Sequence, residues 1–122
     1  MPMLEEQNPD NFVSGASTSD ITDTNSTELI AAQGAGNRVY LKTAVISNGD
    51  PTVTTAVQIL DGSTVKATVY VGALAAGVLV SSPICITFDP PLRGTANTAW
   101  NVKAETNSAQ VRAVLSGFRS RR

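Results

Sequence analysis

Apolar and polar side chains alternate along most of the chain between Arg38 and Phe118, in short segments separated by Gly, Pro, Asn and Asp. Successive side chains of a β-strand point to opposite faces, so this period of two predicts strands with one buried and one solvated face. No segment has a convincing helical period. We expect strands at residues 27–32, 38–47, 52–60, 64–71, 78–89, 100–106 and 109–118.

Turn residues between these segments indicate how the strands connect. Asp61-Gly62 is the strongest hairpin signal, because a tight two-residue turn needs backbone torsions that Asp and Gly tolerate. Pro83 predicts a bulge or a sheet edge, since proline cannot donate to a central ladder. About seven or eight strands, with turns at intervals of roughly 8 to 12 residues, are typical of a sandwich. We therefore predict an all-β fold, a single antiparallel and jelly-roll-like β-sandwich over residues 26–122.

The more apolar face of each strand predicts the core of this sandwich. Trp100 is in phase with Val102 and Ala104, so we expect it inside the core and not on a ligand platform. Cys85 lies between two isoleucines and is expected to be a small apolar residue of a buried strand. The predicted core residues are Val39, Leu41, Val45, Val57, Ile59, Val69, Ile84, Ile86, Phe88, Trp100 and Val102.

Residues 1–25 are rich in Ser, Thr, Asn, Asp and Gly and contain only scattered apolar positions. Such a segment buries too little apolar surface to fold by itself. Either its own domain or a neighbouring chain must then hold it. We predict an extended N-terminal arm that lies across a neighbouring subunit, with Phe12 and Val13 as apolar anchors and the flanking acidic residues steering the approach.

Charge is distributed unevenly along the chain, although the net charge is only −1. Acidic residues precede Arg38 without any Lys or Arg, whereas basic residues predominate after Asp89. These ends either are solvated and keep the chain soluble or dock on neighbouring subunits. Residues 72–77 are unusually apolar for a loop and either fold back over the sandwich or form a contact patch. The candidate interface residues are Phe12, Val13, Leu74, Arg93, Arg119, Arg121 and Arg122.

Few side chains in the sequence could support catalysis. The chain has no His, a single Cys and 16% charged residues. The acids of the strand region, Asp50, Asp61 and Asp89, fall in three separate turns, and a turn role explains each of them. Without His and with one Cys the usual transition-metal sites are excluded, and no calcium-loop pattern occurs. We expect no enzyme activity, no catalytic residue, no metal and no cofactor.

Neither a membrane nor nucleic acid is an expected partner. The N-terminus lacks the basic start and apolar stretch of a secretory signal, and the most apolar stretch is about half the length that crosses a bilayer. The basic sequence from Phe118 to Arg122 is the only candidate for nucleic-acid binding. A contact with protein explains it better, because the rest of the chain is neutral or acidic.

Four stretches of the sequence carry a resemblance to a known family. They are Gly36-Asn37-Arg38-Val39-Tyr40-Leu41, Gln58-Ile59-Leu60-Asp61-Gly62, Pro91-Leu92-Arg93-Gly94-Thr95-Ala96-Asn97-Thr98-Ala99-Trp100 and Val114-Leu115-Ser116-Gly117-Phe118. In these stretches the chain resembles the jelly-roll cement, or decoration, proteins of tailed bacteriophage heads. The resemblance leaves the N-terminal arm unmatched and carries over no catalytic residue. It implies a sandwich on the outer face of an icosahedral shell that resists the internal pressure of packaged DNA.

The expected function is that of a structural virion protein that decorates and cements the outer surface of a phage capsid by bridging neighbouring capsid subunits. The expected partners are the major capsid protein and neighbouring copies of the chain itself in a homo-oligomer. The expected location is the outer surface of the virion, after synthesis in the cytoplasm of the host bacterium. The alternative is a tail or head-fibre module that recognises a host glycan or surface protein, because jelly rolls also serve as adhesins and lectins.

Overall fold

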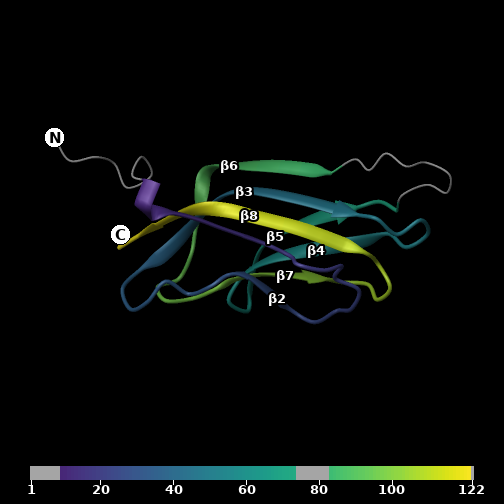
Figure 1. Ribbon diagram of the computed structural model, residues 1–122, viewed down its shortest axis with the longest axis horizontal. Coiled ribbons are helices and arrows are strands. Elements are labelled where there is room, and N and C mark those ends of the chain that lie inside the picture. The colour runs from purple at the N-terminus through teal and green to yellow at the C-terminus, as the bar shows by residue number, and fades with distance from the viewer. Residues whose placement is uncertain (1–8, 74–82, 122) are drawn as a thin grey trace.

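The computed structural model describes residues 9–73 and 83–121, whose strands form two four-stranded antiparallel sheets (Figure 1). A short 3-10 helix, η2 (Pro9–Asn11), precedes the strands. The strands are β1 (Phe12–Ala16), β2 (Thr27–Ile30), β3 (Arg38–Asn48), β4 (Thr55–Asp61), β5 (Thr64–Val71), β6 (Ile84–Arg93), β7 (Trp100–Ala104) and β8 (Val111–Ser120). The predicted all-β sandwich is confirmed. In the described part of the chain, no helix has the length and apolar character that a membrane crossing would require.

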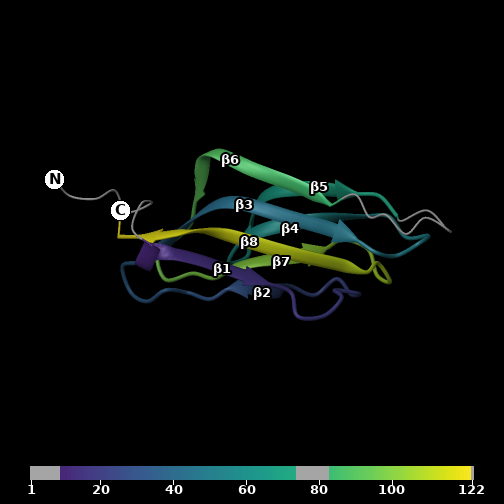
Figure 2. The ribbon, with the colours of Figure 1, turned by 45° about the horizontal axis from the view of Figure 1, so that its top comes forward.

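The order of the strands is that of a jelly roll. Sheet I has the order β1-β8-β3-β6, and sheet II has the order β2-β7-β4-β5. The chain therefore crosses from one sheet to the other at every connection except the β4–β5 hairpin, which is the pattern of two Greek keys. Figure 2 shows β1 beside β8, with β2 beneath them on the same side of the sandwich.

A single core lies between the sheets, and Trp100 is its largest fully buried side chain. The indole Nε1 of Trp100, in sheet II, donates a 3.1 Å hydrogen bond to the carbonyl oxygen of Val39, in sheet I. The ring thus spans the core and satisfies its one polar atom on the opposite sheet. Burial is confirmed for Val39, Leu41, Val57, Ile59, Val69, Trp100 and Val102, and Ile84, Ile86 and Phe88 are partly buried against the core.

A bulge in β3 makes the core prediction wrong for Val45. The pairing of β3 with β8 shifts its register between Leu41 and Thr43, which leaves Lys42 as an extra residue. One extra residue sends the side chains that follow it to the opposite face. Ala44 is therefore buried, whereas Val45 is 37% exposed.

β6 is an edge strand of sheet I, and the prediction of a buried Cys85 is wrong. Cys85 is exposed and lies opposite Val45 of β3. β6 continues as far as Arg93, beyond residue 89, where we expected this strand to end. Pro90 and Pro91 are compatible with this strand because they fall between Thr87 and Leu92, where the pairing of β6 with β3 is interrupted and no backbone N–H has to be donated.

The structure also corrects the predicted boundary of the N-terminal arm. β1, from Phe12 to Ala16, pairs with β8 along its whole length. Ile21 is buried in the core and forms a bridge with Val111. The described part of the segment therefore belongs to the sandwich, because pairing with β8 satisfies its backbone hydrogen bonds. Residues 1–8 lie outside the described residues.

Gly15 allows β1 and β2 to close one side of the sandwich. A Cβ atom at Gly15 would lie 1.6 Å from the backbone carbonyl oxygen of Leu29 in β2. No side chain can replace the hydrogen of glycine at this separation. The first strand of sheet I and the first strand of sheet II therefore meet backbone to backbone.

The β4–β5 hairpin turns one residue later than predicted. Asp61 is the last residue of β4 and pairs with Thr64, so Gly62 and Ser63 form the two-residue turn. The Asp61 carboxylate is buried and accepts hydrogen bonds from the backbone N–H of Thr95 at 2.9 Å and from its hydroxyl at 2.7 Å. Asp61 thus ties the β6–β7 loop to the end of the hairpin.

Asp50 organises the turn that follows β3. Its carboxylate accepts hydrogen bonds from the backbone N–H groups of Thr52 at 2.9 Å and Val53 at 2.8 Å, and from the Thr52 hydroxyl at 3.2 Å. The backbone hydrogen bonds from Thr52 and then Val53 stabilise the charged form and lower the pKa of Asp50 from its ordinary value of 3.8. The turn is therefore held by a carboxylate that must remain ionised.

We expect Asp50→Asn to change the pH dependence of folding stability. Since the pKa of Asp50 is lower in the folded chain, its carboxylate stabilises the fold above the unfolded value of 3.8 and loses this contribution as the pH falls toward the folded value. Urea midpoints of wild type and variant, measured from about pH 7 to about pH 2, should differ most at neutral pH and converge in acid. A difference that stays constant with pH would contradict this role.

Trp100→Ala should lower the free energy of unfolding by about 3 to 5 kcal/mol, because it leaves a cavity and deprives the Val39 carbonyl of a donor. Urea denaturation followed by circular dichroism measures the effect. The matched control is Tyr70→Ala, which removes an aromatic ring that is 79% exposed and should cost less than about 0.5 kcal/mol. Equal losses in the two variants would show that the indole does not support the core.

Candidate functional site

The outer face of sheet I presents three rows of side chains that run across its four strands. Directly opposed residues of an antiparallel pair point to the same face with Cβ atoms about 4.5–5.5 Å apart, so the strand register gives the rows. They are Phe12, Phe118, Tyr40 and Arg93 (the aromatic row); Ser14, Ser116, Thr43 and Thr87 (the hydroxyl row); and Ala16, Val114, Val45 and Cys85 (the aliphatic row).

The aromatic row crosses the sheet near the start of β1 and the end of β8. The rings of Tyr40 and Phe118 are stacked, with centroids 5.2 Å apart and planes 8° from parallel. Phe12, at the β1 edge, is 56% exposed, and Arg93 lies at the β6 edge. The row therefore offers an apolar ring at one edge of the sheet and a cation at the other.

The hydroxyl row crosses the middle of the sheet and contains only small side chains. The hydroxyls of Thr43 and Ser116, on adjacent strands, form a hydrogen bond with each other. Ser14 and Thr87, on the two edge strands, are exposed. Hydroxyl groups can donate and accept, so this row can pair with polar backbone or side-chain groups of a partner.

The aliphatic row leaves apolar surface in water. Val45 is 37% exposed and Val114 is 42% exposed, and Ala16 and Cys85 beside them are also exposed. Val45 is on this face because of the bulge at Lys42. Its exposure extends the apolar strip across the two central strands of the sheet.

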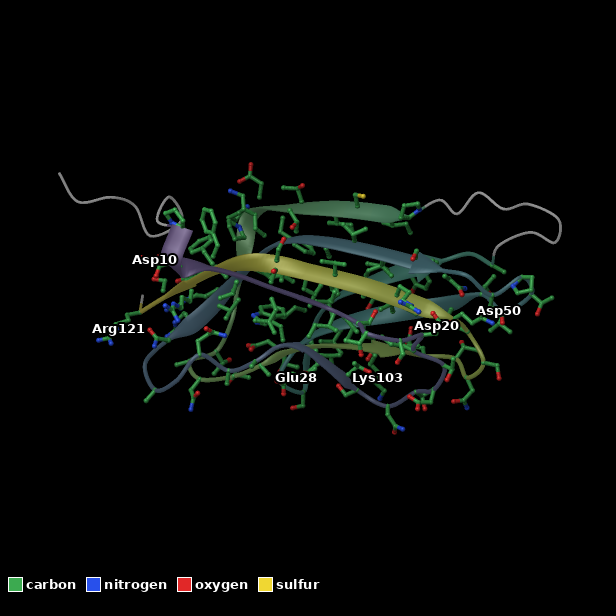
Figure 3. All side chains as sticks on the ribbon, in the orientation of Figure 1. Asp10, Asp20, Glu28, Asp50, Lys103 and Arg121 are labelled. Carbon is green, nitrogen blue, oxygen red and sulfur yellow. The ribbon has the colours of Figure 1, made fainter. Side chains whose placement is uncertain are left out.

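Charge lies at the margins of this face. Arg93 is the one charged residue in the three rows. Beyond the aliphatic row, an exposed salt bridge of 2.6 Å joins Arg112 to Asp20. On sheet II, by contrast, Glu28 and Lys103 lie on neighbouring strands (Figure 3). Burying the three rows themselves would therefore require desolvation of one charged side chain, that of Arg93.

A basic depression adjoins the aromatic row at the end of the sandwich. It has a volume of about 350 Å³ and is lined by Asn11, Asn37, Arg119, Ser120 and Arg121. Figure 3 places Arg121 and Asp10 at this end of the molecule, and Asp20 and Asp50 toward the other end. The basic C-terminal sequence and the start of β1 are thus brought together, although they are far apart in the chain.

A second depression lies on sheet II. Its volume is about 540 Å³, and its lining includes Tyr70, Glu105 and residues 54–56. Tyr70 is 79% exposed, so one aromatic ring stands at this depression with its faces open to solvent.

The structure brings some of the predicted interface residues together. Phe12 and Arg93 belong to the aromatic row, and Arg119 and Arg121 line the basic depression. Val13 is partly buried and packs against the core. Leu74 and Arg122 lie outside the described residues.

Sequence reasoning missed Phe118, Val45 and Val114 as parts of one exposed surface. Phe118 joins Phe12 through the β1–β8 pairing, which connects the two ends of the chain. A local sequence pattern contains no signal for this register. The alternation of apolar and polar residues in β3 could have indicated that Val45 is exposed only if the bulge at Lys42 had been recognised.

No family model matches the sequence, and no curated protein matches it. Among solved structures, the chain is similar to a chain described as part of the cyanophage Pam1 capsid asymmetric unit. The identity is 19%, the match covers 88% of this chain and 81% of that chain, and the TM-score is 0.43. This similarity assigns no role to a residue of the candidate face.

The exposure of Cys85 predicts that its thiol reacts in the folded protein. With a disulfide reagent such as dithionitrobenzoate, the folded chain should release one equivalent of thiolate on the time scale of the urea-unfolded chain. Cys85→Ser should release none. Reaction only after addition of denaturant would show that the aliphatic row is covered.

Proposed function

We propose that this protein is a structural virion protein that decorates and cements the outer surface of a phage capsid by bridging neighbouring capsid subunits, without catalysing a reaction. The outer face of sheet I is the observation that carries the proposal. Its three rows combine exposed apolar side chains and small hydroxyls with a single charged residue, Arg93. A contact with protein can cover such a face without burying unpaired charges.

The spatial arrangement of the four stretches that resemble cement proteins supports the proposal. Asp61 of the second stretch accepts hydrogen bonds from Thr95 of the third. Trp100 of the third donates to Val39 of the first. Tyr40 of the first stacks on Phe118 of the fourth. The resemblance therefore concerns one connected structural unit, and this unit presents Tyr40, Phe118 and Arg93 of the aromatic row.

A bridging protein needs contact surfaces that point to different partners. The three rows of sheet I supply a broad surface with one charged residue, whereas the basic depression supplies a smaller surface with two arginines at the end of the sandwich. In the proposed role the broad face binds the major capsid protein, since burial of apolar surface gives a lasting contact. The basic depression binds a neighbouring chain, and complementary charge determines which chain binds and in which orientation.

The alternative is a fibre module that binds a host glycan. Tyr70, with its ring faces open beside the depression on sheet II, is the observation in its favour, because sugars commonly stack on exposed aromatic rings. Copy number separates the two functions. A cement protein should occur on the order of hundreds of copies per particle, in step with the capsid protein, whereas a fibre occurs in few.

Val114→Glu should weaken attachment to undecorated heads more than tenfold, because a carboxylate in the aliphatic row would lose its hydration at the interface. Co-sedimentation of purified protein with heads from the same phage measures attachment. The matched control is Val65→Glu on β5 of sheet II, since Val65 is 46% exposed and Val114 is 42% exposed.

Thermal unfolding of both variants should remain close to that of wild type, because each new charge is placed in water. Unchanged attachment of Val114→Glu would contradict a capsid contact through sheet I. Loss of attachment to host cells in Tyr70→Ala, together with competition by free sugar, would favour the glycan-binding alternative.

A further inference from the structure

The basic depression has the chemistry of a carboxylate site. Its two charged lining residues are Arg119 and Arg121, and its other lining residues are amides and a hydroxyl. Within residues 9–73 and 83–121, neither arginine forms a salt bridge. A guanidinium group presents a planar fork of donors that matches a carboxylate, so two such groups can receive two carboxylates or grip one.

A third guanidinium group beside the depression adds to its positive character. Arg38 of β3 lies opposite Ser120, which lines the depression. Its Nη1 donates a 3.1 Å hydrogen bond to the carbonyl oxygen of Gly94, whereas its Nε is buried and has no hydrogen-bond partner among the described residues. Because that Nε is buried, Arg38 adds positive charge at this end, and the donors for a ligand come from Arg119 and Arg121.

The chain contains a segment with complementary charge. Residues 1–8 have the sequence Met-Pro-Met-Leu-Glu-Glu-Gln-Asn. Glu5 and Glu6 are the only adjacent pair of acidic residues in the whole sequence, and the segment has no Lys or Arg. Met3 and Leu4 precede this pair and provide apolar side chains that suit the exposed ring of Phe12.

The point at which this segment joins the sandwich favours an exchange between two copies. The segment ends at Asn8 and is followed by Pro9, the first residue of η2, and Asn11 of this helix lines the depression. Eight extended residues reach at most about 29 Å. When two copies meet at this end, each can extend its segment to the depression of the other, and the two contacts are related by a two-fold axis.

We propose that the basic depression binds the N-terminal segment of a second copy of this chain, with Arg119 and Arg121 receiving the carboxylates of Glu5 and Glu6. The exchange is reciprocal and joins the two copies as a dimer. The N-terminal arm was predicted to contact a neighbouring subunit, and this proposal names Arg119 and Arg121 as the residues of that subunit that bind it. It needs no capsid, so it can fail while the proposed cement function stands, and the reverse also holds.

A labelled peptide tests the receiving site directly. The peptide Met-Pro-Met-Leu-Glu-Glu-Gln-Asn, with fluorescein on its C-terminus, is titrated with the full chain, and binding is followed by fluorescence anisotropy. Replacing both glutamates of the peptide by glutamine, or Arg119 and Arg121 of the protein together by glutamine, should weaken binding about tenfold or more. Raising the salt concentration should also weaken peptide binding, because salt screens the attraction between exposed charges.

The matched control is Lys66→Gln, which removes an exposed charge from β5 of sheet II and should leave peptide affinity unchanged. Thermal unfolding verifies that the double arginine variant remains folded. Absence of peptide binding, or binding that neither pair of substitutions alters, would overturn the proposal.

Sedimentation velocity of the full chain without peptide tests the exchange. Wild type should form dimers that dissociate in high salt, and both Glu5→Gln/Glu6→Gln and Arg119→Gln/Arg121→Gln should shift the equilibrium to monomer. Mixing these two variants should restore part of the association, because each retains the half of the contact that the other lacks. A wild type that is monomeric at every concentration would show that the segment does not bind a second copy.

Discussion

The carbonyl oxygen of Val39 is a point at which hydrogen bonds join the two sheets. It accepts a 3.1 Å hydrogen bond from the indole of Trp100 in sheet II and a 3.0 Å hydrogen bond from the backbone N–H of Gly94. A Cβ atom at Gly94 would lie 2.5 Å from the same oxygen, so only glycine permits this approach. Because a buried carbonyl and a buried indole N–H each need a partner, strand β7 and the β6–β7 loop must meet β3 at one place. Tyr40, the next residue of β3, is thereby fixed at the outer face.

The sequence predicted the parts of the fold that depend on local alternation. The strand expected at residues 64–71 has these bounds in the structure, and Trp100 is buried on the face that its phase indicated. Prediction failed where a distant strand decides the outcome. The bulge at Lys42 arises in the pairing of β3 with β8, and it reverses the orientation of Val45. The strand β1 has only five residues and is held by its pairing with β8, almost a hundred residues later in the sequence.

The candidate face could be predicted only in fragments for the same reason. Phe12 and Arg93 were both predicted to be interface residues. Nothing in the sequence placed them in one row with Tyr40 and Phe118. Each residue of the row comes from a different strand, and the register of three pairings sets their order. Sequence reasoning could identify a chain that is poor in catalytic groups and rich in strands. The continuity of its exposed surface depends on long-range pairing.

The common position of the strand ends has a mechanical consequence. β1 starts and β8 finishes at the same end of sheet I, where Phe12 lies opposite Phe118. Tension applied between Pro9 and Arg121 would act first on the hydrogen bonds at that end and would open the pair one rung at a time. A pair of strands whose hydrogen bonds break one after another resists less force than a pair whose hydrogen bonds are all loaded in shear at the same time. A load that enters through the broad face of sheet I therefore meets more resistance than a load that pulls on the two chain ends.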